Sequence, residues 1–486
     1  MAGDPTPGLA SGVRSGYSAG PLIHTFPLTL EPGFRCEAAG PFYYDAERDG
    51  ETVWAFPPFV SEVRSADGER DMVRVLPPLF SYRKYGRDMR WEVGQWLNGS
   101  RVDTIDDKEL KRFSVFPFFF YQDAPDPARR YWGVLPLYGT LKNRLGLDEV
   151  RFAAFPLWVE TKRGLATTEN ILFPFGQIRS GPGLDGWKVW PLVGHEHLEP
   201  TTRTNSMDEA EVVGGHDMRF ALWPVWFHDR LGIGTSNPQQ VDAVMPLYHI
   251  LRSPERDQTS VLWPFVSWSD DREGKFHQWS APWPFVSFAR GEGRTLDRVL
   301  PLFNVGHSPT MDIESYAWPV YRRQHLHTPN MERDRRQYGF YLFVDVREGN
   351  PETRQKSRRL DSWPFFAWSR DREGNERLQV PALMEVFSAN SPGISLNWSP
   401  LWSLWRQERD TKTGVESQSL LWNLYRRERV GGVTKGSLLF GLVQYEKSAA
   451  GRRWRWFHSG RRLSGESVAS PGTGAAYSES NVSKSR

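Results

Sequence analysis

The sequence predicts an all-β fold, a long antiparallel meander built from repeats of about 20 residues. Three observations predict it. Short apolar clusters around a proline recur along the chain, charged turn-forming links separate them, and stripes with the helical period are almost absent. A long meander leaves two edge strands that must be protected. We therefore expect the sheet to close as a large barrel or to coil as a hairpin solenoid.

The apolar clusters are the first repeated element. Val134-Leu-Pro-Leu-Tyr138, Leu222-Trp-Pro-Val-Trp226 and Leu262-Trp-Pro-Phe265 share one pattern, and Phe340-Tyr-Leu-Phe343 is a proline-free version. Their aromatic and aliphatic residues favour strands. The chain has 22 Trp and 29 Phe, and a buried aromatic ring removes about 150–250 Å² from water. We therefore expect these rings to form a sizeable core.

The proline in each cluster needs a physical account, because proline removes a donor from the β-ladder. We expect each strand to bend, or to leave the ladder, at the same height. In Trp363-Pro-Phe-Phe-Ala-Trp368, apolar side chains would then point to both faces of a strand. Links such as Asp270-Asp-Arg-Glu-Gly274 carry glycine, which suits a tight turn. A unit with its link is interpreted as one long strand or two short ones.

Three segments are predicted from these patterns. Residues 1–20 are polar and rich in Gly and Pro, and we expect them to be disordered. Residues 21–462 hold the repeats and form a single β-repeat domain, since a stack of similar units makes one body. Residues 463–486 form a Ser/Gly-rich tail that we also expect to be disordered. No signal peptide is visible, and no apolar window is long enough for a transmembrane helix.

Charge and cysteine content narrow the classes of function. The net charge is +3, from 61 basic and 58 acidic residues, whereas a nucleic-acid partner requires a strongly basic face. We therefore predict no nucleic acid as a partner. Cys36 is the single cysteine, so no intrachain disulfide forms. Phosphate-binding motifs are absent, and no cofactor is predicted. A basic run near the C-terminus is interpreted as a solvated strand end; it comprises Arg452, Arg453, Arg455, Arg461 and Arg462.

Histidines supply the candidate metal site. His195 and His197 are two residues apart, so both point to one face of a strand, an arrangement found in metal sites. His216 and His228 follow, each beside an aspartate that could orient it. We predict a metal site from these four residues, against the alternative that they are solvated or hydrogen-bonded structural histidines.

Two further features are candidates for binding. His325 and His327 form a second pair with the same spacing. The widest gap without an apolar cluster runs from Leu192 to Leu222, and long loops on a regular scaffold often carry binding. We expect a localised site, if there is one, to lie in this insertion, against the alternative of a passive loop.

The repeats resemble uncharacterised bacterial Trp-Pro-Leu-Phe-type β-repeat proteins of unknown function. The resemblance covers roughly residues 26–457 and includes the closing segments Leu421–Tyr425 and Leu438–Leu442. It implies a bacterial source and a shared fold. It transfers no functional residue to this chain.

The function predicted first is a non-catalytic β-repeat scaffold or binding protein of a bacterial cell envelope, with an unknown protein or glycan as its partner. The first alternative is an outer-membrane β-barrel, which would make the membrane the partner and the outer membrane the location. The second is a carbohydrate-active enzyme on a propeller or solenoid. No nucleophile elbow or zinc-protease motif is present, which favours a protein that is not an enzyme, and no catalytic residue is assigned.

Overall fold

Antiparallel strands form almost all of the regular structure in this computed structural model. The structure describes residues 18–48, 50–103, 109–204, 210–388 and 391–456. Within them, 42 strands form one sheet, in which each strand pairs with its neighbours along the chain. The predicted all-β meander is confirmed.

The strands are short, from four to eight residues, and are joined mostly by tight turns. In the first half of the chain they are β1 (His24–Pro27), β2 (Gly33–Ala38), β3 (Tyr43–Arg48), β4 (Glu51–Phe56), β5 (Val60–Ser65), β6 (Arg70–Val75), β7 (Phe80–Tyr85), β8 (Asp88–Val93), β9 (Leu97–Val102), β10 (Leu110–Val115), β11 (Phe119–Asp123), β12 (Tyr131–Val134), β13 (Tyr138–Arg144), β14 (Leu147–Ala153), β15 (Trp158–Arg163), β16 (Ala166–Ile171), β17 (Gly176–Gly181), β18 (Leu184–Val189), β19 (Val193–Leu198), β20 (Thr201–Thr204), β21 (Ala210–Val213), β22 (Gly215–Ala221) and β23 (Trp226–Ile233). In the second half they are β24 (Gln239–Val244), β25 (Tyr248–Arg252), β26 (Arg256–Val261), β27 (Val266–Asp271), β28 (Phe276–Ser280), β29 (Val286–Gly291), β30 (Arg294–Val299), β31 (Phe303–His307), β32 (Met311–Tyr316), β33 (Tyr321–Thr328), β34 (Met331–Tyr338), β35 (Phe343–Gly349), β36 (Lys356–Ser362), β37 (Phe366–Arg370), β38 (Glu376–Val380), β39 (Trp405–Arg409), β40 (Glu416–Leu420), β41 (Tyr425–Val430), β42 (Val433–Leu438), β43 (Val443–Ser448) and β44 (Gly451–Trp456). The helices are η1 (Gly20–Leu22), η2 (Gly40–Phe42), η3 (Pro127–Arg129), α1 (Pro392–Asn397) and α2 (Ser399–Trp402).

The two rims of this ribbon-like sheet differ in chemistry. Turns from an odd-numbered strand to the next even-numbered one are polar and charged, and we call their edge the charged rim. Except at the β20–β21 hairpin and the long segment between β38 and β39, turns from an even-numbered strand to the next odd-numbered one contain the proline clusters or proline-free versions of them, and we call their edge the apolar rim. The apolar rim from β4 to β43 comprises the turns 57–59, 76–79, 94–96, 116–118, 135–137, 154–157, 172–175, 190–192, 222–225, 245–247, 262–265, 281–285, 300–302, 317–320, 339–342, 363–365, 421–424 and 439–442.

The recurrent proline lies in the turn and does not bend a strand, so of the two expectations the bent strand is wrong, and the strand ends at the same height in each unit. In the segment 363–368, Trp363, Pro364 and Phe365 form the turn, and β37 begins at Phe366. The peptide bond before Pro364 is cis, as it is in most of these turns. A turn is compatible with proline because its nitrogen is not needed as a ladder donor. Each unit is therefore two short strands joined at a proline turn.

Neighbouring turns of the apolar rim are hydrogen-bonded to one another. The Trp190 amide donates to the Phe175 carbonyl of the preceding turn at 2.6 Å. The Trp223 amide donates in the same way to the Pro191 carbonyl at 2.7 Å. The β-ladder is thus extended through the turns, and the rim is a continuous hydrogen-bonded edge.

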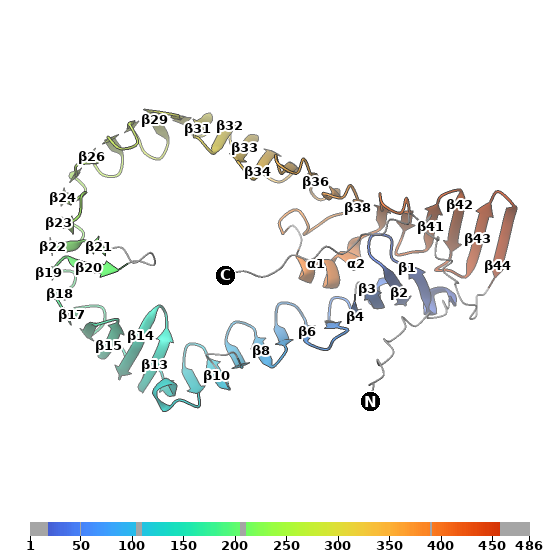
Figure 1. The fold of residues 1–486 in the computed structure, drawn as a ribbon, viewed down its shortest axis with the longest axis horizontal. Coiled ribbons are helices and arrows are strands. Elements are labelled where there is room, and N and C mark those ends of the chain that lie inside the picture. The colour runs from blue at the N-terminus through green and yellow to red at the C-terminus, as the bar shows by residue number, and fades with distance from the viewer. Residues whose placement is uncertain (1–17, 49, 104–108, 205–209, 389–390, 457–486) are drawn as a thin grey trace, which may run out of the picture.

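The sheet coils into a ring-like loop, so that β1–β4 lie beside α1, α2 and the last strands (Figure 1). The contacts join side chains of the two ends. The Tyr44 hydroxyl donates to the Leu396 carbonyl at 2.8 Å, and Thr29 Oγ1 donates to Ser417 Oγ at 2.6 Å. We call this meeting place the seam. In the described residues β1 pairs only with β2 and β44 only with β43, so no β-ladder closes the sheet into a barrel.

The face of the sheet that lines the ring can be followed from the seam. Tyr44 and Ala55 pack on Leu396 of α1, a helix that lies inside the loop between the two ends of the sheet (Figure 1). Directly paired residues share a face, so this inner face continues from Ala55 to its partner Ser61 and onward around the sheet. The opposite face is the outer face.

Buried apolar side chains form two local clusters and no continuous core. None of the 22 tryptophans, all of which lie in the described residues, is buried. The expected aromatic core is therefore wrong, and most rings of the proline clusters are exposed on the apolar rim. The clusters contain Tyr44, Ala46, Val53, Ala55, Val63 and Leu396 at the seam, and Phe120, Tyr131, Leu141, Val150, Phe152 and Val159 farther along.

The predicted segment boundaries are only partly within the described residues. Of the segment 1–20, residues 18–20 are described; Ser18 forms an isolated bridge with His24, and Gly20 begins η1. The repeat sheet runs from β1 to β44 as one body. The rest of the predicted N-terminal segment and the tail 463–486 lie outside the described residues.

Candidate functional site

The most extensive unusual surface is an apolar row on the outer face, beside the apolar rim. Val189 is paired with Val193, which is paired with Ala221, and the row continues through Trp226 to Val244. The same pattern recurs over most of the sheet because the first residue of each odd-numbered strand is usually apolar. We call this row, together with the apolar rim, the apolar band.

The side chains of the apolar band are widely exposed. In the turns, Trp223 is 50% exposed and Leu302 is 63% exposed. Beside the turns, Trp268 and Trp279 are each 46% exposed, and Trp279 stacks on Phe288 with ring centroids 6.0 Å apart. Contiguous apolar surface on this scale marks an interaction site.

The inner face at the same height is apolar around β11–β15, where Phe120, Phe152 and Val159 lie, whereas it is small and polar around β26–β29. Ser260, Ser280 and Ser287 are almost fully buried there, and the hydroxyls of Ser280 and Ser287 are 2.8 Å apart. Around β26–β29 the ribbon is therefore amphipathic: it is apolar at one rim and on the adjoining outer face, and polar on the inside.

A basic row lies farther from the apolar rim on the outer face. The strand β29 shows the order, with Val286 first, Phe288 third and Arg290 fifth. The fifth residue is basic in most odd-numbered strands from β5 to β43. These residues are Arg64, Lys84, Arg101, Lys142, Lys162, Arg230, Arg252, Arg290, Arg347, Arg370, Arg409, Arg429 and Lys447.

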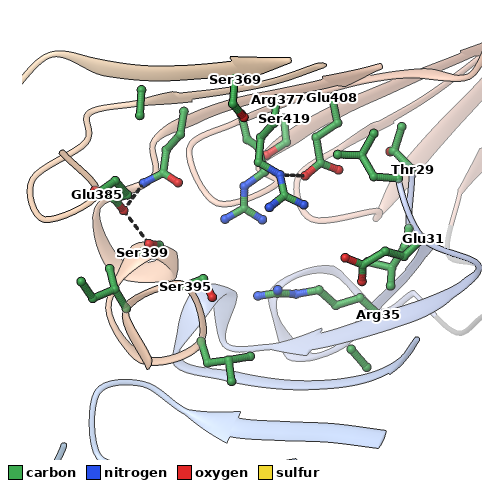
Figure 2. Close-up of a pocket in the computed structure, with 18 of the residues that line it drawn as sticks. Thr29, Glu31, Arg35, Ser369, Arg377, Glu385, Ser395, Ser399, Glu408 and Ser419 are labelled. Carbon is green, nitrogen blue, oxygen red and sulfur yellow. Dashed lines mark hydrogen bonds and ion pairs between the residues drawn. The ribbon is translucent and has the colours of Figure 1, made fainter. Parts of the chain in front are cut away.

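The seam encloses a cavity of about 390 Å³ between the two ends of the sheet. Arg35 of β2 enters it from one side, opposite Arg377 of β38 and Glu408 of β39 (Figure 2). The Arg377 Nε donates to Glu408 Oε1 at 3.1 Å. Glu385, on the segment before α1, accepts a hydrogen bond from Ser399 of α2 (Figure 2). Six arginines and four carboxylates line the cavity: Arg35, Arg48, Arg359, Arg377, Arg406, Arg426, Glu31, Asp361, Glu385 and Glu408.

The charges in the seam cavity are unevenly compensated. Burial lowers the pKa of the Arg406 guanidinium, and the like charge of Arg35 lowers it further. Burial alone would raise the pKa of Glu408, but Arg377, Arg406 and Arg426 outweigh it and hold that pKa below its usual range. In the described part of the chain Arg406 has no hydrogen bond or ion pair, so its guanidinium is available for an anion such as phosphate.

We expect inorganic phosphate to stabilise the seam through Arg406. At constant ionic strength, exchanging chloride for phosphate should raise the thermal midpoint of the wild type by about 2 °C or more, and should leave Arg406→Leu unshifted. Differential scanning fluorimetry measures both. Arg256→Leu, at an exposed arginine far from the seam on β26, is the control. Equal shifts in wild type and Arg406→Leu would contradict the assignment.

The structure does not bring the four predicted metal ligands together. His195 and His197 lie on the outer face, whereas His216, paired with Leu198, points to the inner face and bonds Glu196 at 2.9 Å. His228 lies on the outer face of β23 and hydrogen-bonds Asp242. The alternation of side chains along a strand separates His216 from the others.

Asp217, the carboxylate nearest to His195 and His197, already has its charge compensated by an arginine. Asp217 lies 3.6 Å from His195 Nε2 and 3.8 Å from His197 Nδ1. Arg219 donates to both of its oxygens, at 3.0 and 3.1 Å. Burial tends to raise the pKa of Asp217, but the Arg219 guanidinium outweighs it and lowers that pKa. The other histidine pair, on β33, has an aspartate opposite it without such an arginine.

The predicted insertion between Leu192 and Leu222 is mostly regular structure. It contains the sheet strands β19 and β22, and between them the hairpin β20–β21 on the charged rim. This hairpin points into the loop of the ring (Figure 1). Of the predicted basic run, Arg452, Arg453 and Arg455 lie on the edge strand β44, and the rest lies outside the described residues.

Analysis of the sequence missed both the apolar band and the seam cavity. A signal for the band was present, because repeats of about 20 residues with two turn-forming segments leave only short strands. The apolar residues next to proline then belong to turns, which lie at the surface. The cavity had no comparable signal in the sequence, because its lining residues form two groups that are more than 300 positions apart in the chain.

Comparison with known proteins gives no relative from which to infer a function. No family model matches this chain, and no curated protein matches it significantly. The resemblance to the Trp-Pro-Leu-Phe-type proteins therefore stays a prediction. None of the helices in the described residues is long and apolar enough to span a membrane.

Proposed function

We propose that this protein is a non-catalytic β-repeat scaffold that attaches to one leaflet of a lipid membrane through its apolar band, in a bacterial cell envelope. The observation that carries this proposal is the hydrogen bonding of the apolar rim. A surface that enters lipid must satisfy its backbone donors internally, because hydrocarbon offers no partner.

The turns 172–175, 190–192 and 222–225 meet this requirement completely. Every amide in them donates a backbone hydrogen bond within the turn or to the preceding turn, except at proline, which has no donor. The recurrent proline is thereby explained, since it removes a donor that would otherwise need a partner in lipid. A surface that docks a soluble protein could instead pair its backbone donors with the partner or with interfacial water.

The height of the apolar band matches one leaflet. In β29 the turn is followed by strand residues that are apolar at the first and third positions, Val286 and Phe288, whereas in strands such as β35 only the first of these two positions is apolar. Three strand residues advance about 10 Å, and the turn adds to this, whereas half of the hydrocarbon core measures about 15 Å. A strand that crosses a bilayer needs about 9–11 residues, and these strands have four to eight. The dimensions favour attachment to one leaflet over a full crossing.

The residues beyond the apolar band match the remaining layers of a membrane surface. Trp268 and Trp279 lie at the third-residue level, where indole rings suit the boundary between hydrocarbon and headgroups. Arg290 and the rest of the basic row follow, at the level of lipid phosphates. The full order of turn, aromatic residue and basic residue is present at β29, and the row of apolar first residues and the basic row recur in most odd-numbered strands.

Flotation with lipid vesicles tests this function. We expect the full-length protein to float with vesicles of phosphatidylethanolamine and phosphatidylglycerol in a sucrose gradient. The triple variant Trp223→Asp, Trp263→Asp, Phe285→Asp places charges in three turns of the apolar rim, and should lower the bound fraction about tenfold or more. Exposed side chains are changed, so the fold should be retained.

A matched control uses the other rim. Leu145 and Leu165 are 86% and 81% exposed, in turns of the charged rim. The variant Leu145→Asp, Leu165→Asp should float as the wild type does. Absence of flotation by the wild type, or equal losses in the two variants, would reject the lipid leaflet and favour a protein or glycan as the partner of the apolar band.

A further inference from the structure

A cluster of metal-binding side chains lies where β31–β34 approach the charged rim. His325 and His327 are on β33; Asp312 of β32 is paired with His325, and Glu332 of β34 with His327. His307 of β31 is paired with Asp312. Paired residues share a face, and so do residues two apart. Four adjacent strands therefore place three imidazoles and two carboxylates together on the outer face.

The distances in this cluster fit a metal ion. The ligand atoms of Asp312, His325 and His327 all lie within 4.8 Å of one another. Asp312 Oδ2 is 3.6 Å from His325 Nδ1 and 3.9 Å from His327 Nδ1. In a tetrahedral zinc site with bonds of about 2.0–2.1 Å, neighbouring donor atoms are about 3.3–3.4 Å apart. The separations in the cluster exceed this spacing by at most about 1.5 Å, so small side-chain movements would form the site.

Two more residues are placed to orient the ligands. His325 Nε2 is 3.3 Å from Glu332 Oε1, so this nitrogen can donate to the carboxylate while Nδ1 faces an ion. His307 Nδ1 hydrogen-bonds the second carboxylate oxygen of Asp312. Hydrogen bonds of this kind fix the tautomer and direction of metal ligands. His327 Nδ1 is buried and has no hydrogen-bond partner in the described residues, which leaves its lone pair for a metal.

The other histidine pair shows why charge matters here. Arg219 holds both oxygens of Asp217 beside His195 and His197, and its positive charge opposes a cation. The described ion pairs of Asp312 involve only histidines, which are neutral when they bind a metal. The two pairs have the same spacing but different capacity for a cation.

We propose that Asp312, His325 and His327 bind a Zn²⁺ ion, with water as the fourth ligand. His307 and Glu332 are positioning residues that act through Asp312 and His325. The ion joins β32 to β33 beyond the apolar band, and it is held independently of any membrane.

Calorimetric titration of the EDTA-treated full-length protein with zinc sulfate tests the site. We expect saturable binding in the wild type and no measurable binding in His325→Ala, His327→Ala. A matched control, His195→Ala, His197→Ala, removes the arginine-blocked pair and should bind as the wild type does. Glu332→Gln changes a residue that is 59% exposed, and should weaken binding about tenfold without altering the fold.

Cobalt provides a second readout. Co²⁺ in a tetrahedral site of the wild type should give visible absorption bands that His325→Ala, His327→Ala lacks. The double variant and Glu332→Gln are each compared with the wild type by circular dichroism without metal. Glu332→Gln keeps the test valid if the double variant does not fold. The proposal is overturned if the wild type does not bind zinc, if Glu332→Gln binds as tightly as the wild type, or if the control variant loses binding instead.

Discussion

Arg426→Met is expected to loosen the seam between the first strands and the last ones. Arg426 is 8% exposed; it donates to the Pro27 carbonyl at 3.0 Å and to Glu428 at 2.7 Å. Its guanidinium carbon also lies 4.1 Å from the ring centroid of Phe26. Methionine retains the volume but leaves a buried carboxylate without its partner, which costs about 3–5 kcal/mol. The hydrogen bonds of Thr29 to Ser417 and of Asn423 to Glu37 also cross the seam, so this loss should weaken docking strongly without removing every contact.

Hydrogen exchange measured by mass spectrometry is the appropriate readout, because a long repeat array has no single unfolding free energy. We expect faster exchange in His24–Ala38 and in α1, and unchanged exchange around β20–β30. Arg427→Met alters the adjacent arginine, which points to the outer face, and should leave the seam closed. Unchanged protection of β1 in Arg426→Met would show that the seam does not depend on this residue.

Acidification is expected to weaken the same seam through His24. This side chain is 4% exposed, with Nδ1 3.0 Å from Ser18 Oγ and with Nε2 buried and lacking a hydrogen-bond partner in the described residues. Burial, and then the positive charge of Arg426, lower the pKa of His24 from 6.5 to about 4. As the pH falls, His24 is therefore protonated at a higher pH in the undocked state than in the docked state. Neutral His24 makes its full contribution to docking above pH 6.5. That contribution, about 3 kcal/mol in total, is lost as the pH falls to about 4.

Exchange protection of β1, corrected for the intrinsic pH dependence, should follow this window. His24→Asn cannot be protonated there and should show a smaller pH dependence than the wild type between 6.5 and about 4. The pKa of Glu408 is also lowered, and its protonation would weaken the seam only below the ordinary pKa of a glutamate. A wild type whose protection is constant across the window would contradict the role of His24.

The sequence predicted the fold class well because its local signals agree. Strand-forming residues, glycine links and the absence of helical periodicity all point to a meander. The place of proline was predicted only as two alternatives, since a cluster such as 363–368 suits either the middle of a strand or a turn. The hydrogen-bonding partners decide between these two, and they lie in other repeats. The coiling that brings Tyr44 to Leu396 sums small rotations over many strands, which no local pattern encodes.

The candidate sites were predicted less well, for a reason that the histidines illustrate. Spacing along the chain correctly places His195 and His197 on one face. It gives no information on the register of the next strand, and that register turns His216 to the opposite face. A change of one residue in register reverses the face of every side chain in a strand. The same uncertainty hid the pairing of Asp312 with His325.

The turn-to-turn bonding of the apolar rim also has a consequence for how such chains can change in size. In the described sheet each hairpin pairs with the hairpins on its two sides, and equivalent backbone groups join the neighbouring turns at most steps. Duplication or deletion of one hairpin would therefore alter the circumference of the loop while preserving each local junction. The seam is the exception, because its side chains are specific to the two ends. Natural variation in repeat number should consequently be accommodated between β5 and β36, with the closing residues unchanged.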